Sequence, residues 1–255
     1  MRDENSGWIQ LHSAEFFLLW SVAGFGEVPV ALGIGHVGRT PGRRAELIAQ
    51  ADESLAAREL GTVAVPARDL AGYLRALAEP ELAVDLHAEG RGPELRAMSS
   101  VGAEGSAAAA VVGSEVRVGP VSPDGTVPAL LEALPAVPPG PGRGANVRWV
   151  DYRRACTEGQ RDGTPGFVEA LRDAGLRAPE ANTVMRAISG RVGGGQLGAG
   201  TRTPRGWARA SDTVNWVDTE EGRYAVRRGG EWVMVTPVDV PQLVAMADEM
   251  VADLR

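Results

Sequence analysis

A stretch in the middle of the chain, Pro135 to Gly144, contains four prolines and three glycines. Proline lacks the backbone N–H that helices and sheets use, and glycine loses the most conformational entropy when it is ordered. Such a stretch cannot lie inside a helix or a central strand, so it predicts a linker. We therefore expect an N-terminal half at 1–134, a linker at 135–145 and a C-terminal half at 146–255, the halves being subdomains of one compact domain.

The N-terminal half begins with helical patterns. After a loose terminus at 1–11, Ser13 is expected to cap a helix. Residues 28–34 are apolar and β-branched, which predicts a short strand. Thr40-Pro41 begins a second helix, and a third ends near residue 79. The apolar face of the first helix falls at helical spacing on Phe16, Leu19, Trp20 and Ala23.

The hydrophobic periodicity then changes to strict alternation. At 82–87, leucine and valine alternate with other residues, which predicts a strand. Gly90 to Pro93 predicts a turn, and Gly113-Ser114 predicts a two-residue hairpin turn between two further strands. A short helix at 127–134 closes the half.

The C-terminal half repeats this order of elements. Three helical patterns come first, and the second of them opens at Thr164-Pro165. Strand patterns follow at 214–217, 224–227 and 232–235, and an amphipathic helix ends the chain. Helices, an antiparallel meander and a closing helix in each half predict an α+β fold with an approximate internal two-fold repeat of element order.

The composition excludes several classes of protein. All 26 basic side chains are arginine, so the chain cannot form a lysine Schiff base or provide the lysine of a P-loop. A net charge of -7 argues against a nucleic-acid partner, which would need a basic face. The single cysteine, Cys156, cannot form an intrachain disulfide. The longest uncharged segments have 11 residues and are too short to span a bilayer. We expect a cytoplasmic protein without membrane insertion.

No catalytic, cofactor or metal site stands out. His12, His36 and His87 lack metal-ligand spacing, and Cys156 has no partner for a metal site. Gly193 to Gly198 matches Gly-x-Gly-x-x-Gly, but it follows a helical pattern and precedes none, so we interpret it as a flexible or bulged strand start. No Gly-x-Ser-x-Gly motif occurs. We therefore expect a protein that is not an enzyme. The alternative is an enzyme, namely a hydrolase or nucleotide-binding enzyme built around the glycine cluster at Gly193 to Gly198.

Tryptophan marks one candidate contact. Trp216 and Trp232 lie in strand patterns, so we expect both in the core. Trp207 lies in a loop-like stretch at 202–209, where its exposure would favour a binding role, because tryptophan is enriched at interface hot spots.

An ordered set of motifs resembles the EspG family of actinobacterial type VII (ESX) secretion-associated proteins. The similarity covers nearly the whole chain. The motifs are Ser13 to Trp20, Gly26 to Leu32, Gly38 to Thr40, Leu60-Gly61, the strand at 82–86, Pro138 to Gly142, Gly195 to Gly198, Asn215 to Thr219 and Glu221 to Tyr224.

This resemblance implies a fold and a function. The fold would be α+β, with helical bundles packed on a twisted central antiparallel β-sheet. The function would be that of a cytosolic chaperone, which binds PE–PPE heterodimers at the apolar tip of the PPE helical bundle, keeps them soluble and directs them to their secretion system. Partners would be PE–PPE-like or other WxG-type secretion substrates. A non-catalytic scaffold or regulatory homodimer of the same fold, without a PE–PPE client, is the alternative.

The resemblance also implies where a client would bind. Family members contact the client through the loop after the second core strand and through the C-terminal helical bundle. By position, the loop is Glu89 to Pro93, which is short here, and the bundle is drawn from Thr164 to Ser189 with the closing helix. Burial inside the bundle is the alternative for its apolar residues. With Trp207, the candidate client-binding residues are Gly90, Arg91, Gly92, Phe167, Leu171, Val184 and Met185.

Overall fold

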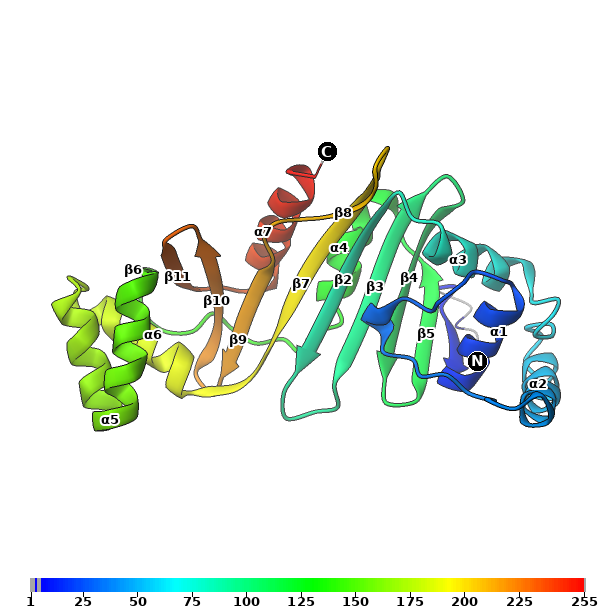
Figure 1. Ribbon diagram of the computed structural model, residues 1–255, viewed down its shortest axis with the longest axis horizontal. Coiled ribbons are helices and arrows are strands. Elements are labelled where there is room, and N and C mark those ends of the chain that lie inside the picture. The colour runs from blue at the N-terminus through cyan, green and yellow to red at the C-terminus, as the bar shows by residue number, and fades with distance from the viewer. Residues whose placement is uncertain (1–2, 4–5, 255) are drawn as a thin grey trace. The chain divides into compact units, whose positions relative to one another are not determined.

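The computed structural model describes residue 3 and residues 6–254 (Figure 1). The chain divides into two compact units, and their boundaries cross the sequence more than once. Unit 1 consists of residues 1–87, 93–133 and 199–209, and unit 2 of residues 88–92, 134–198 and 210–255. Strand β7 (Arg191–Thr203) therefore contributes its first residues to unit 2 and its last five to unit 1.

Unit 1 is built on antiparallel strands in the order β1-β5-β4-β3-β2. Strand β4 pairs with β3 and β5, and β5 pairs with β1, all antiparallel. The end of β7 joins this unit, where the Arg202 N–H donates to the Glu81 carbonyl at 2.7 Å. The strands are β1 (Ile9–His12), β2 (Leu82–Glu89), β3 (Leu95–Gly102), β4 (Gly105–Val112), β5 (Glu115–Pro120) and β8 (Gly206–Arg209), which pairs with β7.

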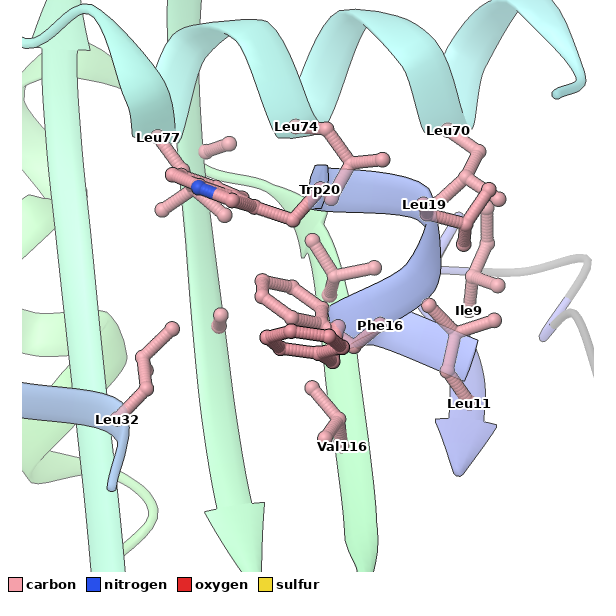
Figure 2. Packing of buried hydrophobic residues seen from close by; sticks show 14 of the residues in the cluster. Ile9, Leu11, Phe16, Leu19, Trp20, Leu32, Leu70, Leu74, Leu77 and Val116 are labelled. Atoms are coloured by element: carbon pink, nitrogen blue, oxygen red, sulfur yellow. The ribbon is translucent and has the colours of Figure 1, made fainter. Parts of the chain in front are cut away.

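Helices α1 and α3 cover the core of unit 1 (Figure 2). The Trp20 ring stacks on Phe16 with centroids 5.6 Å apart, and both side chains are fully buried. Leu70, Leu74 and Leu77 of α3 complete this packing. Of the predicted apolar face of the first helix, Phe16, Leu19 and Trp20 lie in this core, but Ala23 is exposed and follows the end of α1. The helices are α1 (Ser13–Val22), α2 (Pro41–Ala56), α3 (Arg68–Ala78) and α4 (Thr126–Leu131), with 3₁₀ turns η1 (Val30–Leu32) and η2 (Pro123–Gly125).

Unit 2 has the strand order β7-β9-β10-β11-β6, with antiparallel neighbours throughout. Helices α5 and α6 pack against β6 and β11, and α7 packs against β9. Gly163, with φ at 68°, interrupts α5 just before the predicted helix start at Thr164-Pro165. The elements are β6 (Ala145–Arg148), α5 (Trp149–Asp173), α6 (Ala178–Ser189), β9 (Val214–Thr219), β10 (Gly222–Gly229), β11 (Trp232–Pro237) and α7 (Val240–Ala252).

The two units repeat one topology, which confirms the predicted α+β class and repeat of element order. In each, a four-residue strand begins the half and pairs antiparallel with the last strand of its meander. These pairs are β1 with β5 and β6 with β11. A helix closes each half, namely α4 and α7.

Several local predictions were wrong. The expected loose terminus at 1–11 includes four residues outside the described part of the chain, but Ile9 begins β1. Residues 28–34 contain the 3₁₀ turn η1 (Val30–Leu32) and no strand. The cap of α1 is His12, whose Nδ1 accepts the Ala14 N–H at 3.1 Å, while the Glu15 carboxylate accepts the His12 N–H at 2.8 Å.

The predicted linker is part of unit 2 and is hydrogen-bonded to β10. The Gly140 N–H donates to the Arg223 carbonyl at 2.9 Å, and the Tyr224 hydroxyl donates to the Pro141 carbonyl at 3.0 Å. A Cβ built on Gly140 would lie 2.1 Å from the Tyr224 ring, so only glycine allows this approach. We call residues 135–144 the strap, because hydrogen bonds fix it to β10.

Candidate functional site

The loop between β2 and β3 presents an exposed cation. Arg91 forms an ion pair with Glu220 of the β9–β10 turn, and both side chains are 71% exposed. An exposed pair of this kind contributes less than about 1 kcal/mol to folding. Arg91 can therefore exchange Glu220 for a partner's carboxylate at low energetic cost.

Two further ion pairs surround this one in unit 2. Glu89 pairs with Arg191 at 2.7 Å, and Arg186 of α6 pairs with Glu221 at 3.3 Å. Together the pairs connect the loop, the start of β7, the β9–β10 turn and α6. We name residues 88–92 with their partners Arg191 and Glu220 the loop site.

The glycine cluster of the sequence explains how the loop site is held. A Cβ on Gly193 would lie 2.7 Å from the Glu89 carbonyl oxygen and 2.9 Å from the Gly90 Cα. A Cβ on Gly194 would lie 2.4 Å from the Trp216 carbonyl oxygen. Glycine is thus required at both positions for close backbone approach. The cluster forms a strand with a register shift between Arg191 and Gly193, which confirms the interpretation as a bulged strand start.

The β9–β10 turn that carries Glu220 is rigid. The Thr219 hydroxyl accepts the Gly222 N–H at 3.1 Å and donates to the Gly222 carbonyl at 2.8 Å. Next to it, the buried Arg223 pairs with Asp218. These residues belong to the motif that carries the family resemblance, and in the structure they are architectural. Sequence reasoning missed that role. The available signal was the position of Asp218 and Arg223 on either side of a turn between two strand patterns, where antiparallel pairing brings them opposite each other.

Three of the apolar candidates lie in the core of unit 2. Phe167, Leu171 and Val184 are 6%, 0% and 0% exposed, and they pack together with β6 and β11. A client cannot contact them on this surface, so the structure favours the alternative of burial inside the bundle. Met185 is half-buried at the border of the same cluster.

Trp207 lies in unit 1 and is 45% exposed. It is carried by the short strand β8 instead of the expected loop, and its ring covers Gly200, where an added Cβ would lie 2.6 Å from the indole nitrogen. Trp216 is buried as expected, but Trp232 is 45% exposed, so its placement in the core was wrong. Trp232 lies in the first position of β11.

The titratable groups form local pairs. His87 contacts Glu94 at 2.5 Å, and with Arg96 it holds the pKa of the Glu94 carboxyl below its usual value, with the Arg96 hydrogen bond as the larger cause. Burial, and then the neighbouring Cys156, raise the pKa of Tyr152 to about 12.

Within residue 3 and residues 6–254, no group of three or more histidine, cysteine or carboxylate side chains could hold a metal ion. In the same part of the chain, no helix has the length and apolarity to cross a bilayer.

Comparison with known proteins gives a consistent match. The protein-family model described as "EspG family" matches residues 12–249 of the chain. Among solved structures, the chain is similar to the type VII secretion system chaperone EspG5 of Mycobacterium tuberculosis, solved in complex with a PE25–PPE41 dimer. The TM-score is 0.76 at 17% identity, and the match covers 97% of this chain and 96% of that one. No curated protein matches the sequence.

Proposed function

Because this chain is a member of the EspG family, we propose that it is a cytoplasmic secretion chaperone, without catalytic activity, which binds a PE–PPE-like substrate and directs it to a type VII secretion system. The observation that carries the proposal is the family match over residues 12–249. The solved relative is a chaperone in complex with a PE–PPE dimer, and it shares the fold over nearly the whole chain.

The loop site supports a binding function. Arg91 is exposed, while the backbone beneath it is held by the close approach of Gly193 to Gly90. A fixed backbone lowers the entropy lost on binding. A planar guanidinium binds a carboxylate through two hydrogen bonds. Because the chain has no lysine, every long cationic side chain that could contact a client is an arginine.

Burial removes several residues from the set of candidate client contacts. Arg91 with its flanking Gly90 and Gly92, the half-buried Met185 and the exposed Trp207 remain proposed client contacts. Phe167, Leu171 and Val184 would act indirectly, by holding α5 and α6 together. A secretion client with an exposed apolar helix tip stays soluble only when a partner surface covers that tip.

Co-purification with a PE–PPE pair tests the proposal. We expect the chain to co-elute with a pair encoded near its gene in size-exclusion chromatography. Arg91→Glu and Trp207→Ala should each weaken the complex by roughly tenfold, as loss of an interface hot spot does. The matched control is Arg117→Glu, which removes a similarly exposed arginine–glutamate pair on β5.

The alternative function gives a different result. If the chain elutes as a stable homodimer and binds none of the PE–PPE or WxG-type pairs tested, the scaffold or regulatory homodimer replaces the chaperone. If it binds a pair but Arg91→Glu and Arg117→Glu behave alike, the chaperone function stands and the loop site is excluded.

A further inference from the structure

The strap repeats its contacts with β10 every three residues. The carbonyls of Pro135, Pro138 and Pro141 all accept hydrogen bonds from this strand. The donors are Arg223 Nη2 at 3.4 Å, the Arg223 N–H at 2.8 Å and the Tyr224 hydroxyl at 3.0 Å, in that order. In a β-strand, backbone groups that point the same way are two residues apart. A polyproline II (PPII) helix has three residues per turn, so the spacing in the strap indicates that conformation.

Burial along the segment has the same period. Leu134 and Gly140 are buried and Val137 is half-buried, so residues three apart form the inward edge of the helix. The other two edges are exposed, with Pro135, Pro138 and Pro141 on one and Ala136 and Pro139 on the other.

The sequence itself dictates this conformation. Apart from Ala136, every residue from 134 to 141 is a proline or precedes one. The proline ring fixes φ at about -65°, and a residue before proline is restricted to extended or PPII geometry. The segment therefore has little backbone freedom left to lose when it binds a partner. Gly142, with φ at 121°, ends the helix.

The exposed edges offer apolar rings and hydrogen-bond acceptors. Their prolines have no N–H, and the described residues donate no hydrogen bond to the carbonyls of Ala136 and Pro139. A β-strand cannot pair here, because a ladder needs N–H donors from both strands. Aromatic side chains fit this chemistry, since their flat rings pack on pyrrolidine rings and the N–H of tryptophan or O–H of tyrosine donates to a carbonyl.

The strap also presents one charge. Arg143 is its only charged residue and is exposed. The neighbouring Glu180 is engaged by Arg177 in a close ion pair, and Arg143 forms no ion pair within the described part of the chain. A carboxylate of a partner would therefore be complementary to Arg143.

We propose that residues 134–141 bind in an aromatic-lined groove of a partner protein, of the class that takes Pro-x-x-Pro segments as PPII helices, with a carboxylate at its border for Arg143. Pro138 and Pro139, adjacent on the two exposed edges, would lie between the aromatic rings. Pro135 and Pro141 would lie one turn to either side. This surface is separate from the loop site, and the proposal does not depend on a chaperone function.

The thermal midpoint of two proline variants tests the conformation. Ala136→Pro adds a ring at an exposed position whose N–H bonds to no described residue, so the midpoint should stay the same or rise. The matched variant Gly140→Pro removes the N–H that donates to the Arg223 carbonyl, and it should lower the midpoint by about 5 °C or more. An equal loss in both variants overturns the PPII assignment.

Binding is tested with the full chain and proline-binding domains as probes. The chain is titrated into ¹⁵N-labelled SH3, WW and EVH1 domains that bind Pro-x-x-Pro ligands. We expect at least one domain to bind, with a shift of the indole N–H signal in its groove. Pro138→Ala should weaken binding about fivefold or more, whereas Pro123→Ala, at an exposed proline of η2, should change it less than about twofold.

A peptide of residues 134–143 tests the role of β10. It should bind several-fold more weakly than the folded chain, because the strap is already ordered in the chain. A peptide that binds more tightly would show that β10 hides the prolines, and this overturns the proposal. So does no binding of any probe to the unaltered chain, or an equal effect of Pro138→Ala and Pro123→Ala. Self-association of the chain that Pro138→Ala removes would make a second copy the occupant and overturn the assignment to another protein.

Discussion

The guanidinium of Arg223 makes a two-point contact with the carboxylate of Asp218, at 2.6 Å from Nε to Oδ1 and 3.1 Å from Nη2 to Oδ2. The arginine is fully buried, and its plane lies over the Trp216 ring. Its backbone also fixes the strap, because the Arg223 N–H donates to the Pro138 carbonyl at 2.8 Å and its carbonyl accepts from Gly140. Arg223 thus makes the buried ion pair with its side chain and holds the strap, which precedes β6, with its backbone.

Asp218→Asn should destabilise the protein by about 3 kcal/mol, because removing one partner of a buried pair leaves a charge without compensation. The free energy of unfolding from urea denaturation measures this. The matched control is Asp212→Asn, an exposed aspartate that should change stability by less than about 0.5 kcal/mol. Equal stability of the two variants would contradict a structural role for the pair.

The strap shows why a composition argument fails here. Four prolines and three glycines do predict the absence of helix and strand, and that part is correct. Composition does not determine whether the segment is held in place, because its hydrogen-bond partners are distant in the sequence. Those on β10 lie more than 80 residues away, and Thr183 of α6 lies 40 residues from Arg143. Strands β1 and β6 were missed for the same reason, since four residues give too short an alternation and each is stabilised by a distant meander strand.

Gly193→Ala should disturb the loop site, because its Cβ would meet the Glu89 carbonyl and the Gly90 Cα, which are backbone atoms that cannot rotate away. We expect a loss of about 1–3 kcal/mol and faster hydrogen exchange at residues 88–92. Gly92→Ala in the same loop has open space around its Cβ and is the control. If Gly92→Ala accelerates exchange as much, close approach at Gly193 is not what fixes the loop.

Periodicity correctly placed the helices of the bundle but not their exposed sides. Phe167 and Leu171 lie four residues apart on α5, which is the spacing of a helix face, and Val184 lies on α6. A face that binds a client has the same spacing as a face that packs on a sheet. Which one it is depends on β6 and β11 lying against that face. The prediction of Arg91 and Trp207 as client contacts depended instead on loop and motif arguments, and both side chains are exposed.

Leu171→Ala should lower stability by about 2–4 kcal/mol, since the side chain is fully buried and a cavity would remain. Val150→Ala on the same helix removes a side chain that is 67% exposed and should have little effect. Thermal and urea denaturation compare the two. A loss of client binding in Leu171→Ala with unchanged stability would return Leu171 to the list of contacts.

Tyr152 should titrate far above the usual tyrosine range. Burial, and then Cys156, raise its pKa to about 12, whereas an unfolded chain ionises its tyrosines near pH 10. Between these values the unfolded state has released the proton and the folded state has kept it, so stability is fully present below about pH 10 and falls as the pH rises toward 12. The ¹³Cζ NMR shift of Tyr152 reports the ionisation directly. Tyr152→Phe should show a shallower loss of stability over this range. A midpoint near 10 for Tyr152 in the folded protein would contradict the assigned environment, and an equal alkaline loss in Tyr152→Phe would assign that loss to other groups.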